Sequence, residues 1–563
     1  MKPERSPYRK SDASSSFTLP LNAPAPTWSP RSDQHYRVYE QSSHRSRYSS
    51  VTTLLPDREY VGTALPYPCP LCIPPKASAL TGLGEPEKPS PLQPIAEKPS
   101  MSKTHEYFFI VNVCLAQFLA LGGLAQSVAP LFIIGDYFGV DNAGLLSWYT
   151  AAFSLALGAF ILPAGRIGDM YGHKRIFVLG WAWYAISSLA VGFSYVSRTN
   201  GSLTLNILRG FQGLGPAFIV PNAMALIGKT FPVGMKKNVV FSLFGACGPT
   251  GFVFGALFSA ILAQTGWWPW VFWALSIVCT LVCVASCFII PGDSPKPNST
   301  FDFTGAATGV SGLILINFAF NQAPVVGWQT AYISFTLGIG ILLLVMFAFV
   351  ELHMAKQPLL PVRGLQKEAW FALACIAAGW SSHGIWLYYF FNYVQLFRHA
   401  TPIAAAAQIS PVAFLGPICA LSTGYLLKKI RVAYIMLLAM LCFTFGTLFL
   451  AIAPIDQPYL VFTFWSVIIM PGGMNWSFPS GTILLSNAMP KEHQGMSASL
   501  VSTVVNYSIS LGLGIAGTVN KYTAEKHGTL AGLRAGWYFG IGLDVLGIAI
   551  AGYFVWISRP QKS

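Results

Sequence analysis

About fourteen hydrophobic stretches follow one another between Tyr107 and Trp556, and they contain almost no charged residues. Each has roughly 20 apolar positions, the length at which an α-helix crosses the hydrocarbon core of a bilayer. Lipid offers the backbone no hydrogen-bond partners, so a spanning segment must be a helix or part of a closed barrel. The pattern therefore predicts an all-α polytopic membrane protein. We expect its helices over residues 107–133, 143–163, 175–196, 203–228, 238–263, 269–290, 304–322, 330–350, 368–391, 403–427, 432–453, 459–488, 496–518 and 535–557.

The loops between these stretches differ in basic charge. One alternate set, together with the C-terminal end, holds sixteen Lys and Arg residues, including Lys174 and Lys428, and the opposite set holds five. Cytoplasmic loops of membrane proteins carry an excess of Lys and Arg. We therefore expect both termini to be cytoplasmic, as an even number of spans requires.

The segment before the first stretch, residues 1–106, is rich in Ser, Pro, Tyr and Arg and has no sustained apolar period. This composition predicts a disordered cytoplasmic tail. Its first ten residues have no apolar core, which argues against a signal peptide. The first hydrophobic stretch is then expected to act as the insertion signal, and residues 558–563 to form a short cytoplasmic end.

The chain also repeats itself. The segment Pro221–Pro232 ends the fourth stretch and Pro479–Pro490 ends the twelfth, both with prolines eleven residues apart and offset by 258 residues. The same offset carries the first stretch onto the ninth. We predict two six-helix halves, 107–290 and 367–557, with 291–366 contributing two inserted helices between them. Parallel halves with a substrate site between them are an architecture of secondary transporters.

Composition excludes several classes of protein. Of 563 residues, 53% are hydrophobic and 10% charged, and the formal charge is +14. Thirteen of the 35 basic residues lie in the first 106 residues among ten acids, so we expect no nucleic-acid partner. Eight of the ten cysteines fall in expected helices, where thiols behave as small hydrophobes. The chain has no Gly-x-x-x-x-Gly-Lys-[Ser/Thr] nucleotide motif and no cluster of His, Asp and Glu. We expect no cofactor, no metal site and no enzymatic activity.

The loop between the second and third stretches carries the most specific short motif. It reads Gly165-Arg-Ile-Gly-Asp169-Met-Tyr-Gly172-His-Lys174-Arg175. This resembles the signature loop of the major facilitator superfamily, G-x-x-x-D-R-x-G-R-[KR]. The resemblance implies that Gly165, Gly172, Lys174 and Arg175 form a latch between the two halves, with Asp169 gating it.

Two positions of this loop depart from the family pattern. Met170 and His173 stand where the superfamily usually has arginines. The departure leaves two candidates, Arg175 and Arg166, as the partner of Asp169.

A second motif lies in the fourth stretch. Leu208-Arg209-Gly-Phe-Gln-Gly-Leu-Gly215 resembles the fourth-helix motif of the superfamily's drug–proton antiporters, in which the Arg is linked to proton transfer. The alternative is that Arg209 extends to the membrane surface along its apolar stem.

A third motif lies in the fifth stretch. Gly245-Ala-Cys-Gly248-Pro249-Thr-Gly251, with Gly255 one turn later, resembles the antiporter motif of that helix. Small residues at this spacing let two helices touch backbone to backbone. Generic packing is therefore the alternative reading.

The count of fourteen spans with a central pair is similar to the fungal fourteen-span drug–proton antiporter family. Asp302-Phe-Thr-Gly305 and Asn317-Phe-Ala-Phe-Asn321-Gln-Ala-Pro324 are similar to its aminotriazole-resistance branch. The resemblance covers about residues 105–557. Sugar porters are disfavoured, because Pro291-Gly-Asp-Ser-Pro stands where they have P-E-S-P-R.

Ionisable residues at membrane depth cost on the order of 3 kcal/mol or more, so each is a functional candidate. Arg209, Asp544 and His383 lie inside expected helices, and with Asp169 they are our candidates for proton coupling and gating. The alternative for Asp544 and His383 is a structural hydrogen bond between helices. The first stretch has no acid, although many relatives have one there.

Aromatic and amide side chains on several stretches suit a cavity for amphiphilic or cationic organic ligands. The alternative for some of them is the aromatic belt at the membrane surface. The candidates for the cavity are Gln117, Trp148, Trp380, Trp386, Tyr389, Asn475 and Trp476. Separately, Asn200-Gly-Ser202 is a glycosylation sequon on the expected outer side, whereas Asn298-Ser-Thr300 faces the cytosol and should stay bare.

These features predict a secondary transporter that exports small organic molecules in exchange for protons by alternating access. An uptake porter for a siderophore or other small nutrient shares the same fold and is the nearest alternative. A non-transporting sensor that signals through its tail is the second. We expect a monomer in the plasma membrane, with the vacuolar membrane as the alternative location.

Overall fold

The computed structural model describes residues 101–197, 200–232, 234–293, 301–355, 357–360, 362, 365–488 and 496–557. The chain divides into two units, 1–95 and 96–563, and every described residue belongs to the second. Three expected features lie outside the described residues: most of the N-terminal tail, the bare sequon at Asn298 and the C-terminal end at 558–563.

The described residues form helices and no strand, which confirms the all-α prediction. Twelve helices in this part of the chain are long and apolar enough to cross a membrane. Two further helices, α10 (Lys367–Leu396) and α14 (Thr463–Asn487), are 30 and 25 residues long and are not among these twelve. They lie where the pattern predicts the ninth and twelfth stretches.

The helices of the first half begin at Lys103. They are α1 (Lys103–Ala125), α2 (Leu131–Phe138), α3 (Ala143–Tyr171), α4 (His173–Gly192), α5 (Gly201–Thr230), α6 (Met235–Thr265) and α7 (Trp270–Ile289). The expected first span, 107–133, stops short at Ala125. Pro130, which has no N–H to donate, begins the short α2 instead.

The inserted pair and the second half follow. They are α8 (Phe303–Val326), α9 (Ala331–His353), α10 (Lys367–Leu396), α11 (Pro402–Gln408), α12 (Pro411–Lys429), α13 (Val432–Ala451), α14 (Thr463–Asn487), α15 (Ser497–His527) and α16 (Thr529–Ile557).

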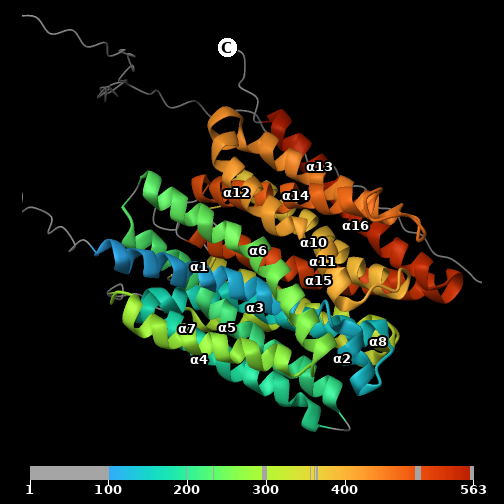
Figure 1. Ribbon diagram of the computed structural model, residues 1–563. Helices are drawn as coiled ribbons and strands as arrows, with labels where there is room; N and C mark the ends of the chain where they lie inside the picture. Colours follow the sequence, from blue (N-terminus) through green and yellow to red (C-terminus); the bar gives the residue numbers. More distant parts are fainter. Residues whose placement is uncertain are drawn as a thin grey trace, which may run out of the picture. The chain divides into compact units, whose positions relative to one another are not determined.

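The two halves repeat the same packing. In the first half α1 packs on α6, and α4 packs on both α5 and α7. In the second half α10 packs on α15, and α13 packs on both α14 and α16. The halves meet where α3 packs on α15 and α6 on α12, and Figure 1 shows the two groups of helices side by side. The repeat that the proline spacing indicates is therefore a repeat of helix packing.

Glycines bring α1 and α6 into backbone contact. A Cβ on Gly251 would lie 2.1 Å from the carbonyl oxygen of Phe118, and one on Gly255 would lie 2.4 Å from that of Gly122. Both distances are far below van der Waals contact, so only glycine fits at either position. The antiporter-like motif thus fixes how α6 lies along α1.

The inserted helix α8 is held in the seam between the halves by buried polar groups. The hydroxyl of Ser510 on α15 donates to the carbonyl oxygen of Ala151 on α3 and lies 2.9 Å from Oδ1 of Asn317 on α8. The amide of Asn321, one turn along α8, donates to the Ser510 carbonyl oxygen. All three polar side chains are fully buried. One serine therefore ties α8 to both halves.

We expect Gly251→Ala to destabilise the protein by about 1–3 kcal/mol, because its new methyl group must displace the α1 backbone. Gly542→Ala on α16 is the matched control, because a Cβ there meets nothing within 4 Å. Thermal unfolding of the two purified variants checks this. Equal melting temperatures for both would contradict the packing of α1 on α6.

Candidate functional site

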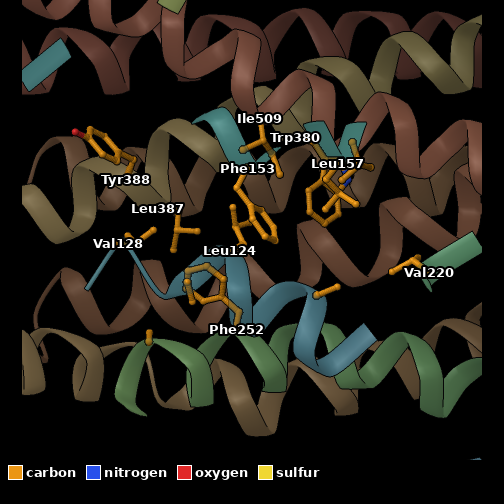
Figure 2. Close-up of a cluster of buried hydrophobic side chains, with 14 of the residues drawn as sticks. Leu124, Val128, Phe153, Leu157, Val220, Phe252, Trp380, Leu387, Tyr388 and Ile509 are labelled. Carbon is orange, nitrogen blue, oxygen red and sulfur yellow. The ribbon is translucent and has the colours of Figure 1, made fainter. Parts of the chain in front are cut away.

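A cavity of about 140 Å³ lies between the two halves. Helices α1, α3, α5 and α6 wall it on one side, and α10, α12, α14 and α15 on the other. Figure 2 shows apolar side chains gathered here, with Leu124 and Phe252 from the first half and Leu387 and Ile509 from the second. Among the described residues that line it there is no Asp, Glu, Lys or Arg. The wall is therefore apolar and aromatic, with a few amides and hydroxyls.

Four of the seven residues expected in the cavity line it: Gln117, Trp380, Trp386 and Asn475. Gly245, Gly248 and Pro249 of the α6 motif line it as well. The sequence analysis placed these three in the antiporter-like motif, with helix packing as the alternative, and did not expect them in the cavity. Pro249 also contacts the other half, since a Cβ on Gly416 of α12 would lie 2.7 Å from it.

The other three expected residues lie elsewhere. The indole N–H of Trp148 donates to Gln322 on α8, in a separate groove. The ring of Tyr389 packs against Gly536 on α16. The indole of Trp476 donates to Ser422 on α12. Helix register places each of these rings on a neighbouring face of its own helix.

His383 is the titratable candidate that faces the cavity. Its imidazole lies between Trp380 and Trp386, with ring centroids 5.4 Å and 5.7 Å away, and is 5% exposed. Its Nδ1 atom is buried and has no hydrogen-bond partner in the described part of the chain. This nitrogen is therefore an unsatisfied polar atom beside the cavity.

Arg209 is fully buried inside the first half and does not line the cavity. Its guanidinium donates to the carbonyl oxygens of Tyr149 and Gly123 and to the side chains of Gln212 and Ser127, at 2.6–3.2 Å. Every one of these partners is neutral. The guanidinium therefore ties α5 to α3 and to the end of α1.

One hydroxyl links Arg209 to the cavity wall. The Ser127 hydroxyl that accepts from Arg209 lies 3.4 Å from the hydroxyl of Thr150. Thr150 lines the cavity. Two hydroxyl groups therefore connect the buried guanidinium to a residue of the cavity wall.

Asp544 is fully buried on α16, behind α10 as seen from the cavity. Its Oδ2 accepts a hydrogen bond of 2.6 Å from Ser382, and its Oδ1 has no partner in the part of the chain that the structure describes. Ser382 precedes His383 on α10. Two successive residues of α10 therefore contact Asp544 and line the cavity, respectively.

The loop at residues 165–175, which we call the latch loop, is bound by Asp293, an acid that the sequence analysis did not select. Gly172, with φ +95°, ends α3 and lets α4 begin at once. The Asp293 carboxylate, just beyond α7, accepts from the backbone N–H groups of His173 and Lys174 at 2.8 and 3.0 Å. The Lys229 ammonium, at the end of α5, lies 3.2 Å from it. Asp293 thus joins three helix ends by capping α4.

Burial alone would raise the pKa of the Asp293 carboxyl, but the N–H donors of Lys174 and His173 and the charge of Lys229 outweigh it. The net pKa lies below the ordinary value. The signal for this residue was present in the sequence, because Asp293 follows a hydrophobic stretch on the same side of the membrane as the basic loop.

The remaining latch residues lie around this centre. Gly165 faces Pro221 and Ser499, so it marks a contact with α15 of the other half. The Arg166 guanidinium donates to Gln357, in the linker before α10. Asp169 lies 3.5 Å from the His173 imidazole.

The two predicted basic residues of the latch behave differently. The Lys174 ammonium donates to the carbonyl oxygen of Cys287 at the end of α7, whereas Arg175 is exposed. Lys174 therefore joins the start of α4 to the end of α7, whereas Arg175 lies at the surface.

At the opposite end of the bundle three hydrogen bonds join the halves. Gln395 donates to Ala129, Tyr388 to Ala143, and the backbone of Ile403 to Gln264. All three lie at the end where α10 terminates, so they close this end of the cavity. Asn200, the predicted sequon residue, is exposed near the same end, immediately before α5.

Comparison with known sequences gives one family. Residues 113–513 match the Major Facilitator Superfamily. The chain is 50% identical over 461 residues to a "Low affinity ammonium transporter" of Saccharomyces cerevisiae, covering 80% of this chain and 88% of that protein. It is 41% identical to "Efflux pump terJ" of Aspergillus terreus, covering 81% and 89%. It is 37% identical to the "Aminotriazole resistance protein" of Saccharomyces cerevisiae, covering 80% and 84%.

Solved structures share the fold at low identity. A transporter of the POT family, in complex with a thioalcohol-conjugated peptide, aligns with a TM-score of 0.59 at 14% identity, covering 81% of this chain and 96% of that one. The nucleoside transporter NupG aligns with a TM-score of 0.55 at 12% identity, covering 80% and 100%.

We expect the stabilisation from Asp293 to depend on pH. A carboxyl whose pKa is lowered by folding stabilises the protein fully above its unfolded pKa, about 4, and loses this effect as pH falls through the folded pKa. The melting temperature of Asp293→Asn should therefore lie below wild type at pH 7 and approach it as pH falls below about 4. Asp136→Asn, at an exposed acid, should show no such convergence. A deficit that persists at low pH would contradict the assignment.

Proposed function

Because the chain belongs to the major facilitator superfamily, within its fungal drug-efflux family, and is therefore a transporter, we propose that it exports small organic molecules in exchange for protons. The observation that carries the proposal is the apolar, aromatic cavity between the two halves, with an unpartnered imidazole nitrogen in its wall. Such a wall suits uncharged or weakly basic organic solutes, because it offers ring faces and amides but no fixed counter-charge.

Alternating access would use the contacts at the two ends of the bundle. The halves 107–290 and 367–557 would rock against each other, with 291–366 joining them. Opening the cavity at one end requires breaking the hydrogen bonds of Gln395, Tyr388 and Ile403. Opening the other end instead would separate Gly165 of the latch loop from Ser499 of α15, which it faces in this structure.

Two groups on either side of α10 would carry the proton. His383 lines the cavity and has a buried Nδ1 without a partner, and Asp544, on α16, has a buried Oδ1 without a partner in the described part of the chain. A proton arriving at Asp544 would change its bond to Ser382 and so the position of α10. Arg209 would sense the occupied cavity through Ser127 and Thr150.

Uptake of ammonium or a small amine is the second candidate. A relative at 50% identity is named a low affinity ammonium transporter. The cavity volume of about 140 Å³ is below the range of about 300–1,000 Å³ that drug-sized ligands occupy, and it suits a small solute. Ring faces such as those of Trp380 and Trp386 attract small cations without a carboxylate.

The topology and the setting complete the proposal. Both termini would face the cytosol, and the protein would work as a monomer in the plasma membrane, with the vacuolar membrane as the alternative. Asn200 would carry a glycan on the outer side. Its position immediately before a spanning helix leaves little room between the sequon and the membrane.

Cells that express the protein should accumulate less of an exported solute than cells that lack it, and an uncoupler should abolish the difference. The measurement is a panel of fluorescent weak bases and small toxins, run beside radiolabelled methylammonium. Lower accumulation of panel members supports export. Higher methylammonium accumulation with no effect on the panel would replace export by the second candidate.

We expect Asp544→Asn to lose proton-driven transport while it keeps solute exchange. An amide of equal size can still accept from Ser382 but cannot carry the proton. In proteoliposomes, uphill transport under a pH gradient should fall to the level of protein-free liposomes, whereas counterflow without a gradient should continue. His383→Gln is expected to behave similarly if His383 carries the proton, and to lose counterflow as well if it binds the solute. Normal uphill transport by both variants would refute this assignment of the coupling residues.

A further inference from the structure

A second hollow lies outside the cavity that the proposed function uses. A groove of about 440 Å³ is walled by α3 and α5 of the first half and by α8 of the inserted pair. Its outer wall includes Leu203 and Ile207, which are 58% and 52% exposed on the spanning helix α5. Large apolar side chains exposed on a spanning helix face lipid. The groove therefore opens toward the bilayer rather than into the central cavity.

The walls of the groove are uncharged and carry aromatic rings. The rings of Trp148 and Phe318 lie 5.7 Å apart across the junction of α3 and α8, and Phe138 closes the side at Gly201. Among the described residues that line the groove none carries a charge. A phosphate or a quaternary ammonium head group would find no counter-charge here. Flat rings suit a rigid fused-ring body more than flexible acyl chains.

One polar atom in the groove has no partner. Oδ1 of Asn206 on α5 is buried without a hydrogen bond, and a buried unpaired acceptor is costly. Two neighbouring polar groups are already engaged, Ser202 with Tyr149, and Gln322 with both Trp148 and Tyr332, whereas Asn200 is exposed where α5 begins. The free group is an acceptor, so the ligand that completes it must bring a hydroxyl or N–H donor. Asn206 lies less than two turns from the start of α5, close to the end of the span where lipid hydroxyl groups reside.

We propose that this groove binds a membrane sterol, with its hydroxyl donating to Asn206 Oδ1 and its ring system against Trp148 and Phe318. The site is independent of which solute the central cavity takes. The sterol fills the seam between α8 and the first half, on the face of α8 that the amides Asn317 and Asn321 do not occupy. Its expected effect is to hold the inserted pair against α3 and α5.

The test is photolabelling of the full-length purified protein in phosphatidylcholine nanodiscs, with a sterol that carries a diazirine and an alkyne. Label should map to α5 and α8 and be displaced by unlabelled sterol. The methyl ether of the same sterol lacks the donor and should compete about fivefold less well. Sterol should also raise the melting temperature of the wild type, because a ligand that binds the folded state stabilises it.

Two variants separate the groove from the general lipid surface. Ile207→Trp fills the groove and should remove the label and the sterol-dependent rise in melting temperature. Ile277→Trp on α7 places the same side chain at another lipid-facing position, 55% exposed in the native chain, and should leave both unchanged. Equal labelling of the two variants would overturn the proposal. Displacement of the label by phosphatidylcholine as readily as by sterol would overturn it too, and would make the occupant a phospholipid. If Ile207→Trp does not fold, the methyl-ether comparison on the wild type decides: equal competition by ether and sterol refutes the bond to Asn206.

Discussion

The constraint on which this structure depends is that buried polar groups must find partners inside the protein, because lipid supplies none. Arg209 shows how it is met. Its guanidinium is fully buried, and four neutral groups from α1, α3, α5 and the turn after α1 accept its hydrogen bonds. Removing the side chain would take away four hydrogen bonds between these segments. A single charged residue therefore holds several helices of the first half together as one body.

In the second half, the buried ionisable groups have fewer hydrogen bonds. Asp544 has one hydroxyl donor and one free oxygen, and His383 has a free nitrogen. In the first half, the charged group of Arg209 has hydrogen-bond partners from several segments. In the second half, one oxygen of Asp544 and one nitrogen of His383 lack partners. Helix α10 lies between Asp544 and the cavity. A proton or a solute can change its hydrogen bonds at Ser382 and at His383. This asymmetry suits a transporter in which one half provides a frame and the other half provides the response.

Helix α8 of the inserted pair contacts both halves, so we expect it to take part in their motion. Ser510 connects α8 to α3 and α15 at once, across the seam between the halves. Any rocking of the halves must slide past this serine or carry α8 with it. The groove lies on another face of α8, where this helix meets α3 and α5. A molecule bound in the groove would therefore affect how α8 moves.

The sequence by itself determined the all-α membrane fold and the family, because helix length in lipid is a local property and the family's motifs are short. It offered close packing at Gly251 and Gly255 as an alternative reading, which the contacts with α1 then showed. Only the tertiary structure decided which faces meet. Gln117, Trp380, Trp386 and Asn475 line the cavity, whereas Trp148, Tyr389 and Trp476 turn to other helices. A spanning helix is apolar on every side, so its pattern carries no record of which side faces lipid, a neighbour or the cavity.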